Sequence, residues 1–168
     1  MNDVYDYQSD FKNTRKLSSG LEGGVLFPVY HAFVRLAAYL STVLIFFTSF
    51  LTQNARNMIA TSLLTFFGWQ YSAPPLRLKE VPLLDSCSNG LIVSLTWLVG
   101  YTYGRGRLSC IPSNVFIIPL CTTGVHALGA VVDVDSDVAA GQTTIATYFG
   151  HHFAALFGAS MLYVFRKV

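Results

Sequence analysis

The sequence predicts an all-α fold, a polytopic membrane helical bundle with five transmembrane helices, and two observations carry this prediction. Of the 168 residues, 52% are hydrophobic and only 12% are charged, whereas a soluble domain usually carries about 25% charged residues. The apolar residues also gather in uncharged runs, each close to the ~20 residues that a helix needs to cross a bilayer. We therefore expect an integral, multi-pass membrane protein whose immediate partner is the lipid bilayer.

Five uncharged runs mark the expected helices. They cover Leu36–Thr52, Asn57–Ser72, Ser86–Gly104, Val115–Val132 and Thr143–Phe165. Gly, Ser and Thr recur inside these runs, which suits helices that pack closely against one another in a membrane. The sequence shows no repeat and no linker, so it indicates a single domain over residues 1–168.

Composition excludes several other functions. The net charge of +2 is small, and no basic run interleaves with aromatic residues, so we expect no nucleic-acid partner. Cys87, Cys110 and Cys121 have no C-x-x-C spacing, and we interpret them as packing residues rather than as a disulfide or a metal site. The acidic first residues do not have the pattern of a signal peptide.

The acidic residues fall on one side of the predicted membrane. Two predicted helices separate the opening segment NDVYDYQSD from the loop YSAPPLRLKEVPLLD, and two more separate that loop from DVDSD. These three segments should therefore share one side. All nine acids lie there or in the first helical turn: Asp3, Asp6, Asp10, Glu22, Glu80, Asp85, Asp133, Asp135 and Asp137. Ordinary loop solvation is the alternative, but it would scatter acids on both sides.

The spacing of these acids indicates a metal site. Asn2, Asp6 and Asp10 are four residues apart, as are Asp133 and Asp137, and this spacing aligns side chains on one helical face. Stacked carboxylates repel one another unless a cation neutralises them. Mg²⁺ is typically held by one or two carboxylates together with phosphate oxygens, so two clusters suit two ions around one diphosphate.

Basic residues near the same segments complete the expected site. Arg77 and Lys79, with Arg15 and Lys16, are suited to bind the remaining phosphate oxygens. A diphosphate at the mouth of an apolar bundle implies an apolar tail inside it, which describes an isoprenoid diphosphate. The expected catalytic residues are Asp6, Asp10, Asp133 and Asp137, which would help the diphosphate to leave as the allylic C–O bond breaks.

Aromatic and histidine side chains are weaker candidates. Tyr71, Phe66 and Trp69 are suited to steady a carbocation through their ring faces, although plain packing is the simpler explanation. His126 lies two helical turns before Asp133 in the same expected helix. It either polarises or deprotonates an acceptor, or it bonds to a neighbouring helix, and the second interpretation is the simpler one.

Three segments of the sequence resemble signature segments of the UbiA superfamily of intramembrane prenyltransferases. They are NDVYDYQSDFKNTRK, YSAPPLRLKEVP and DVDSDVAAGQTTIATYFG, in that order. The resemblance implies a nine-helix bundle with its aspartate motifs on the cytosolic side. It also implies Mg²⁺-dependent transfer of a prenyl group from an isoprenoid diphosphate to a hydrophobic acceptor, which is aromatic, a carotenoid or another lipid.

By position, the resemblance assigns a role to several residues. Asn2, Asp6 and Asp10 match the first metal motif, Asp133 and Asp137 match the second, and Arg77 and Lys79 match the diphosphate contacts. The stretch HALGAVVDVDSDVAAGQTTIAT is most similar to the branch that contains lycopene elongases.

The sequence departs from the family pattern in three ways. Thr14 stands where relatives often have Pro, Val138 stands where many have a basic residue, and the chain matches only the five central helices of nine. We therefore expect residues 1–168 to be a partial UbiA-like domain that is poorly stable and inactive alone.

Two non-enzymatic alternatives remain. One is a catalytically inactive, truncated paralogue that acts as a membrane binding or structural protein, which the missing helices favour and the intact acids oppose. The other is a transporter of divalent cations. It is disfavoured because the acids lie at the rim of the bundle and none lies in the middle of a predicted helix.

Overall fold

The structure, a computed structural model, describes residues 1–12, 17, 24–104 and 106–165, and within these ranges it contains helices and no strand. The prediction of an all-α fold is therefore confirmed. Four residues of the sequence predictions lie outside the described ranges: Thr14, Arg15, Lys16 and Glu22.

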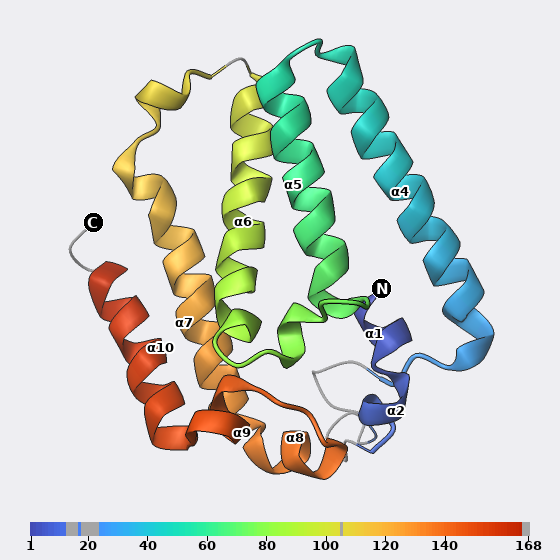
Figure 1. Cartoon of the computed structure of the whole chain (residues 1–168), viewed down its shortest axis with the longest axis vertical. Helices are drawn as coiled ribbons and strands as arrows, with labels where there is room; N and C mark the ends of the chain where they lie inside the picture. The colour runs from blue at the N-terminus through green and yellow to red at the C-terminus, as the bar shows by residue number, and fades with distance from the viewer. Residues whose placement is uncertain (13–16, 18–23, 105, 166–168) are drawn as a thin grey trace.

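Five long helices form a row in chain order (Figure 1). They are α4 (His31–Leu51), α5 (Ala55–Ser72), α6 (Leu84–Tyr103), α7 (Ile117–Val132) and α10 (His151–Phe165). Each packs against the next in the row, and α7 contacts both α6 and α10 extensively. Their bounds agree with the uncharged runs to within a few residues, except in the last case.

Short helical elements gather at the lower end of this row in Figure 1. They are α1 (Asn2–Tyr5), α2 (Tyr7–Asp10), the 3-10 turn η2 (Leu78–Glu80), α8 (Val134–Ala140) and α9 (Ile145–Phe149). Three further 3-10 turns, η1 (Pro28–Tyr30), η3 (Leu108–Cys110) and η4 (Ser113–Phe116), lie in the remaining connections. The three segments that sequence analysis assigned to one side therefore do lie at one end of the bundle.

The last predicted helix, Thr143–Phe165, is two helices rather than one. Thr144 and Thr147 form a capping box that starts α9, and Gly150 separates α9 from α10. Gly150 has φ 88° and ψ 155°, a conformation that essentially only glycine adopts. The uncharged run gave no indication of this break, because hydropathy does not report backbone conformation.

Small residues bring α6, α7 and α10 close together. A Cβ atom added to Gly124 would lie 2.9 Å from the carbonyl oxygen of Gly158, and the converse distance is also 2.9 Å. At Gly90, an added Cβ would lie 2.1 Å from Thr123 Oγ1. Close backbone approach of this kind is typical of helices packed in membranes.

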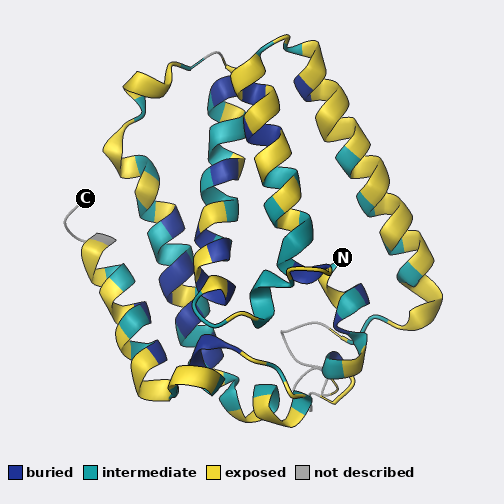
Figure 2. Cartoon of the chain, viewed as in Figure 1, coloured by how far each residue is buried: buried dark blue, intermediate teal, exposed yellow. Residues whose placement is uncertain are grey.

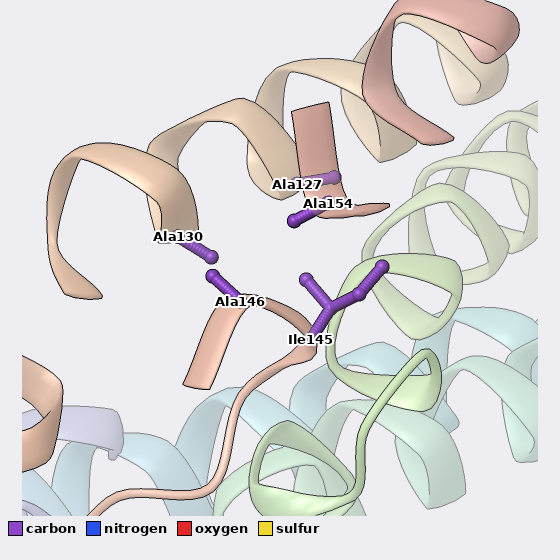
Figure 3. Packing of buried hydrophobic residues seen from close by; sticks show 5 residues of the cluster. All are labelled: Ala127, Ala130, Ile145, Ala146 and Ala154. Carbon is purple, nitrogen blue, oxygen red and sulfur yellow. The ribbon is translucent and has the colours of Figure 1, made fainter. Parts of the chain in front are cut away.

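The buried apolar core lies where α9 meets α7 and α10. Figure 3 shows its members, which are small except for one: Ala127, Ala130, Ile145, Ala146 and Ala154. Ile145 and Ala154 are fully buried. This cluster packs α9 against α7 and α10, next to the segment that carries Asp133 and Asp137.

Burial is uneven along the row (Figure 2). Helix α4 is exposed along almost its whole length, and Ser49 is its one buried residue. Among the described residues, two stretches are long and apolar enough to cross a membrane, Pro28–Leu51 and Ser113–Val132. Five membrane-spanning helices therefore remain a prediction.

Candidate functional site

A cavity of about 310 Å³ lies among the short elements and the adjoining ends of α5 and α7. Six of the site residues predicted from the sequence line it: Asn2, Asp6, Asp10, Lys79, Asp133 and Asp137. Its other lining residues are Ser9, Tyr71, His126, Gly129, Ala130, Ser136, Ala140, Gln142 and Thr144. Residues from both ends of the chain therefore meet around one cavity.

The two acidic segments share a local sequence, D-x-x-S-D, that sequence analysis did not identify as a repeat. Asp6 begins the first copy and Asp133 the second. Asp6 has φ −97° and ψ 0°, and Asp133 has φ −95° and ψ 2°. This sparsely populated conformation is common among active-site residues. Each aspartate separates two helices, so the expected stripe of Asn2, Asp6 and Asp10 bends at Asp6.

Hydrogen bonds within the two copies also match. Ser9 Oγ donates to the carbonyl oxygen of Asp6 at 2.8 Å, and Ser136 Oγ donates to that of Asp133 at 2.8 Å. The backbone N–H four residues after each first aspartate donates to the same carbonyl, again at 2.8 Å in both copies. The repeated sequence therefore builds the same bent turn twice, with one copy on each side of the cavity.

Asp6 is paired with cations from the loop between α5 and α6. Its carboxylate is 4% exposed, and Oδ2 forms an ion pair with Lys79 Nζ. Its other oxygen, Oδ1, lies 3.7 Å from Arg77 Nη2 and accepts no hydrogen bond. Arg77 also forms an ion pair with Glu80. Lys79 and Arg77 thus lie next to the first acidic segment, and Asp6 has an oxygen available for a further ligand.

The loop that carries these cations has an unusual backbone. The Pro74–Pro75 peptide bond is cis, and Arg77 has φ 42° and ψ 57°, in the left-handed region. This conformation costs a non-glycine residue about 1 kcal/mol or more. Backbone hydrogen bonds from Arg77 N to Ala73 O, at 3.2 Å, and from Glu80 N to Arg77 O, at 2.8 Å, hold it.

Asp137 has a different environment. It is half-buried, and Thr144 Oγ1 donates to its Oδ2 at 3.3 Å. Burial, together with the negative charge of Asp133, raises the pKa of Asp137 from 3.8 to about 6. The second acidic segment is therefore electrostatically strained at neutral pH, and a bound cation would relieve that strain.

Asp85, at the start of α6, supports the segment that follows α8 and was not predicted as a site residue. It is fully buried, and its carboxylate accepts hydrogen bonds from the backbone N–H groups of Ser86 and Ile145, both at 2.7 Å. Ile145 directly follows Thr144, which bonds Asp137. A lone acid at the start of an otherwise uncharged run was the sequence feature that marked this position.

Neutral polar side chains form a network next to the carboxylates. Tyr71 Oη lies 3.1 Å from His126 Nε2, and Ser86 Oγ lies 3.2 Å from His126 Nδ1. Asn89 Nδ2 donates to Tyr71 Oη at 3.0 Å. The expectation that His126 bonds to neighbouring helices is therefore confirmed, and the same residue also lines the cavity.

The other two aromatic candidates lie elsewhere. Trp69 stacks on Tyr39, with ring centroids 5.1 Å apart, and its Nε1 donates to Thr42 Oγ1 at 3.1 Å. Phe66 packs edge-on against Phe67, with centroids 5.3 Å apart. For these two, the simpler interpretation as packing residues holds, and Tyr71 is the one of the three that lines the cavity.

Two further contacts fix the first acidic segment in place. Ser72 Oγ donates to Asn2 Oδ1 at 2.6 Å, and Gln142 Nε2 donates to Ser9 Oγ at 2.8 Å. Ser72 and Gln142 were not predicted as site residues, since polar side chains of this kind are common in loops and helix ends.

The donor set of the cavity suits a hard cation shared with an anionic ligand. Within the described residues, no three His, Cys, Asp or Glu side chains form a complete metal site. The cavity instead offers carboxylates from two segments and the buried Oδ1 of Asp6, which has no hydrogen bond. Mg²⁺ fits this arrangement, because it is usually held by one or two carboxylates and completes its shell with water and phosphate.

A helical bundle with two matched aspartate segments at one end defines a class of intramembrane enzyme. The chain belongs to the UbiA prenyltransferase family, whose sequence pattern matches residues 1–165. The resemblance stated from the three sequence segments is therefore confirmed.

Individual relatives come from carotenoid biosynthesis. The chain is 32% identical over 158 residues to the C(50) beta-cyclic carotenoids biosynthesis protein LbtBC of Dietzia sp., covering 94% of this chain and 36% of that protein. It is 34% identical over 153 residues to a lycopene elongase/hydratase of Corynebacterium glutamicum, covering 89% and 52%. The chain thus spans about half, or less, of the length of these relatives.

Solved structures show the same fold. A UbiA homolog from Archaeoglobus fulgidus bound to GPP and Mg²⁺ superposes with a TM-score of 0.72 at 23% identity, covering 98% of this chain and 56% of that one. The same homolog bound to DMAPP and Mg²⁺ gives 0.70 at 21% identity.

Proposed function

We propose that residues 1–168 form part of a UbiA-type domain that transfers a prenyl group from an isoprenoid diphosphate to a hydrophobic acceptor, with Mg²⁺ as cofactor. One observation carries this proposal: two copies of the same acidic turn and a lysine from a third segment line one cavity. The solved relatives bound to GPP or DMAPP with Mg²⁺ support the donor and the metal. The carotenoid-related relatives support an acyclic polyene such as lycopene as the acceptor.

Each cluster has a role in binding the donor. Asn2, Asp6 and Asp10 of the first acidic segment, and Asp133 and Asp137 of the second, would hold Mg²⁺ at the cavity that they line. Bound Mg²⁺ would neutralise the charge that develops on the diphosphate as it leaves. Lys79 lines the cavity next to Asp6, so its ammonium group is placed to donate to a phosphate oxygen as well. Arg77 does not line the cavity but lies 3.7 Å from Asp6 Oδ1, and it is proposed as a further contact together with Arg15 and Lys16.

The remaining residues bind the prenyl group and exclude water. Gly129 and Ala130 present an apolar wall to the cavity directly before Asp133. This wall lets a prenyl chain lie along α7 while its diphosphate stays with the carboxylates. The ring of Tyr71 is close enough to the cavity to steady an allylic cation. Exclusion of water matters because a carbocation is otherwise hydrolysed.

We also propose that the five long helices span the membrane with the acidic end at the cytosolic side. The exposed apolar length of α4 supports this, since contiguous apolar surface of this extent suits lipid or neighbouring helices better than water. The two stretches that meet the length and hydropathy criteria, Pro28–Leu51 and Ser113–Val132, support at least part of this arrangement.

Calorimetry on a nine-helix protein that contains residues 1–168, purified in detergent, tests the proposed metal and donor sites. Dimethylallyl diphosphate should bind in the presence of MgCl₂, and its affinity should collapse when a chelator is added. Asp133→Ala should remove this metal-dependent binding, whereas Asp135→Ala should not, because Asp135 is exposed and does not line the cavity. Equal affinity with and without Mg²⁺ would contradict the proposal.

A further inference from the structure

The network of Tyr71, His126, Ser86 and Asn89 has no role in binding the metal or the diphosphate, yet it borders the same cavity. Tyr71 and His126 line the cavity directly, and Ser86 is fully buried behind His126. The four residues come from three helices: Tyr71 from α5, Ser86 and Asn89 from α6, and His126 from α7. Such a network of neutral hydrogen-bonding groups requires partners for every buried proton.

The hydrogen bonds of Asn89 orient its amide group within this network. Asn89 Nδ2 also donates to the carbonyl oxygen of Asp85 at 2.9 Å, and a carbonyl only accepts, so the amide orientation is set. Its second proton goes to Tyr71 Oη. We assign the Tyr71 hydroxyl proton to His126 Nε2, 3.1 Å away, and the imidazole proton to Nδ1, which lies 3.2 Å from Ser86 Oγ. In this tautomer Nε2 of His126 is a proton acceptor.

We propose that Tyr71 and His126 form the pair that accepts the proton released when a prenyl group is added to a carbon–carbon double bond. This role rests on the proposed prenyl transfer to an alkene acceptor. It is distinct from donor binding, because the pair acts after the diphosphate has left.

The chemistry of that addition requires a base. The C1–O bond of the donor breaks, and its electron pair leaves with diphosphate. The π electrons of the acceptor form a bond to C1, which leaves a cation on the other alkene carbon. A neighbouring C–H bond then breaks, its electrons form a new double bond, and its proton passes to Tyr71 Oη while the hydroxyl proton passes to His126 Nε2. If water adds to the cation instead, the proton that the water loses goes to the same pair.

The position of His126 suits this step better than that of the carboxylates. His126 precedes Asp133 by seven residues, which is about 10 Å along the helix. Asp6 is paired with Lys79, and the other carboxylates of the cavity are assigned to Mg²⁺. Of the four histidines in the chain, His126 is the one that lines the cavity. A base at this depth is on the apolar side of the diphosphate, where the alkene of an acceptor would meet C1.

The test separates ionisation of the donor from loss of the final proton. Wild type, His126→Gln and Tyr71→Phe are prepared as a nine-helix protein that contains residues 1–168, because these residues are expected to be inactive alone. They are reconstituted in liposomes that contain lycopene, with labelled dimethylallyl diphosphate and Mg²⁺. Diphosphate release, elongated product and prenyl alcohol are measured separately. His152→Gln is the matched control, since His152 is exposed on α10 and does not line the cavity.

General-base residues typically contribute at least about 100-fold, so elongated product should fall by about that factor in His126→Gln. Diphosphate release should change by less than about fivefold, and prenyl alcohol should accumulate, because the cation then reacts with water. Tyr71→Phe should likewise lower the ratio of elongated product to released diphosphate, and His152→Gln should leave that ratio unchanged.

Two results would overturn the inference while leaving the proposed function intact. One is unchanged product formation in His126→Gln. The other is an equal loss of diphosphate release and product, which would assign His126 to donor binding or packing. Absence of Mg²⁺-dependent diphosphate release from the wild type would instead overturn the proposed function, and the role of His126 with it.

Discussion

The two D-x-x-S-D turns have the same sequence pattern, backbone and internal hydrogen bonds, but the fold neutralises their charges differently. Asp6, in the first turn, is almost fully buried and paired with Lys79, with Arg77 close by. Asp137, in the second turn, is half-buried next to Asp133, and the pKa of its carboxyl is raised to about 6. Lys79 and Arg77 thus form ion pairs with Asp6 in the first turn, whereas in the second turn burial and the charge of Asp133 outweigh the opposing charge of Lys79 and raise the pKa of Asp137. The second turn is therefore where metal binding should be most sensitive to pH.

The largest expected effect is on catalysis, and it should be equal for the two turns. Asp6→Ala and Asp133→Ala should each reduce prenyl transfer by roughly 100-fold or more, because each removes a metal ligand next to the developing negative charge. The rate of product formation from a labelled prenyl diphosphate in saturating Mg²⁺ measures this. Near-normal turnover in either variant would show that its turn is not part of the active site. Asp135→Ala is the control within the second turn.

Stability should distinguish the two turns. Asp6→Ala leaves the nearly buried Lys79 without its partner, and breaking a buried ion pair in this way costs about 3 kcal/mol. Asp133→Ala should cost much less, because Asp133 is only half-buried and its charge disfavours the ionised form of the neighbouring Asp137. Thermal unfolding of both variants without metal measures this difference. Equal losses of stability would contradict the contrast between the turns.

The stability of the protein should depend on pH through the protonation of Asp137. Because its pKa in the folded protein is raised to about 6, its contribution to stability is present below pH ~4 and lost as the pH rises through ~6. Mg²⁺ requires the ionised carboxylate, so metal affinity should fall as the pH drops below about 6, and binding above that pH should restore stability. Melting temperatures between pH 4 and 8, with and without MgCl₂, measure this.

Variants of the second turn identify the residue that causes this pH dependence of stability. Asp137→Asn should flatten the dependence of the metal-free melting temperature on pH, whereas Asp135→Asn should preserve it. An unchanged pH profile in Asp137→Asn would assign the titration to another group.

Substitution of Asp85 tests which contacts hold the second turn in place. Asp85→Asn retains one acceptor oxygen, so one of the two backbone N–H groups at Ser86 and Ile145 loses its partner, at a cost of about 1–3 kcal/mol. Since Ile145 follows Thr144, we also expect weaker Mg²⁺ binding through displacement of Asp137. Unfolding and metal titration of the same variant measure both effects. Loss of stability with unchanged metal affinity would show that Asp85 does not position Asp137.

Substitution of the serines in the two turns should cause the smallest losses of stability, and the loss should differ between Ser9 and Ser136. Ser136→Ala removes one hydrogen bond to Asp133 O, which contributes about 0.5–1.5 kcal/mol. Ser9→Ala removes the equivalent bond and also leaves Gln142 Nε2 without its acceptor, so it should be the more destabilising. Chemical denaturation of both variants measures the difference. Equal effects would show that the link through Gln142 contributes nothing.

The sequence by itself determined the features that depend on local composition and spacing. Uncharged runs predicted the long helices, because a helix in an apolar environment excludes charged residues over its whole length. Spacing of four residues predicted the aspartates that face one cavity, since i and i+4 share a helical face. The same spacing did not reveal that both turns bend at their first aspartate, because the serine that holds each bend is also common in ordinary helix ends.

Only the tertiary structure decided which distant residues meet, and which charges are neutralised as a result. The bond from Ile145 N to Asp85 spans 60 residues, and that from Gln142 to Ser9 spans 133. Neither follows from periodicity, because each joins elements that are distant in the sequence: α6 to the start of α9, and α2 to the segment between α8 and α9. The two acidic turns differ for the same reason. Their sequences build the same bend, but packing brings Lys79 to Asp6 and buries Asp137 beside Asp133, and burial and neighbouring charge set the energy of a carboxylate.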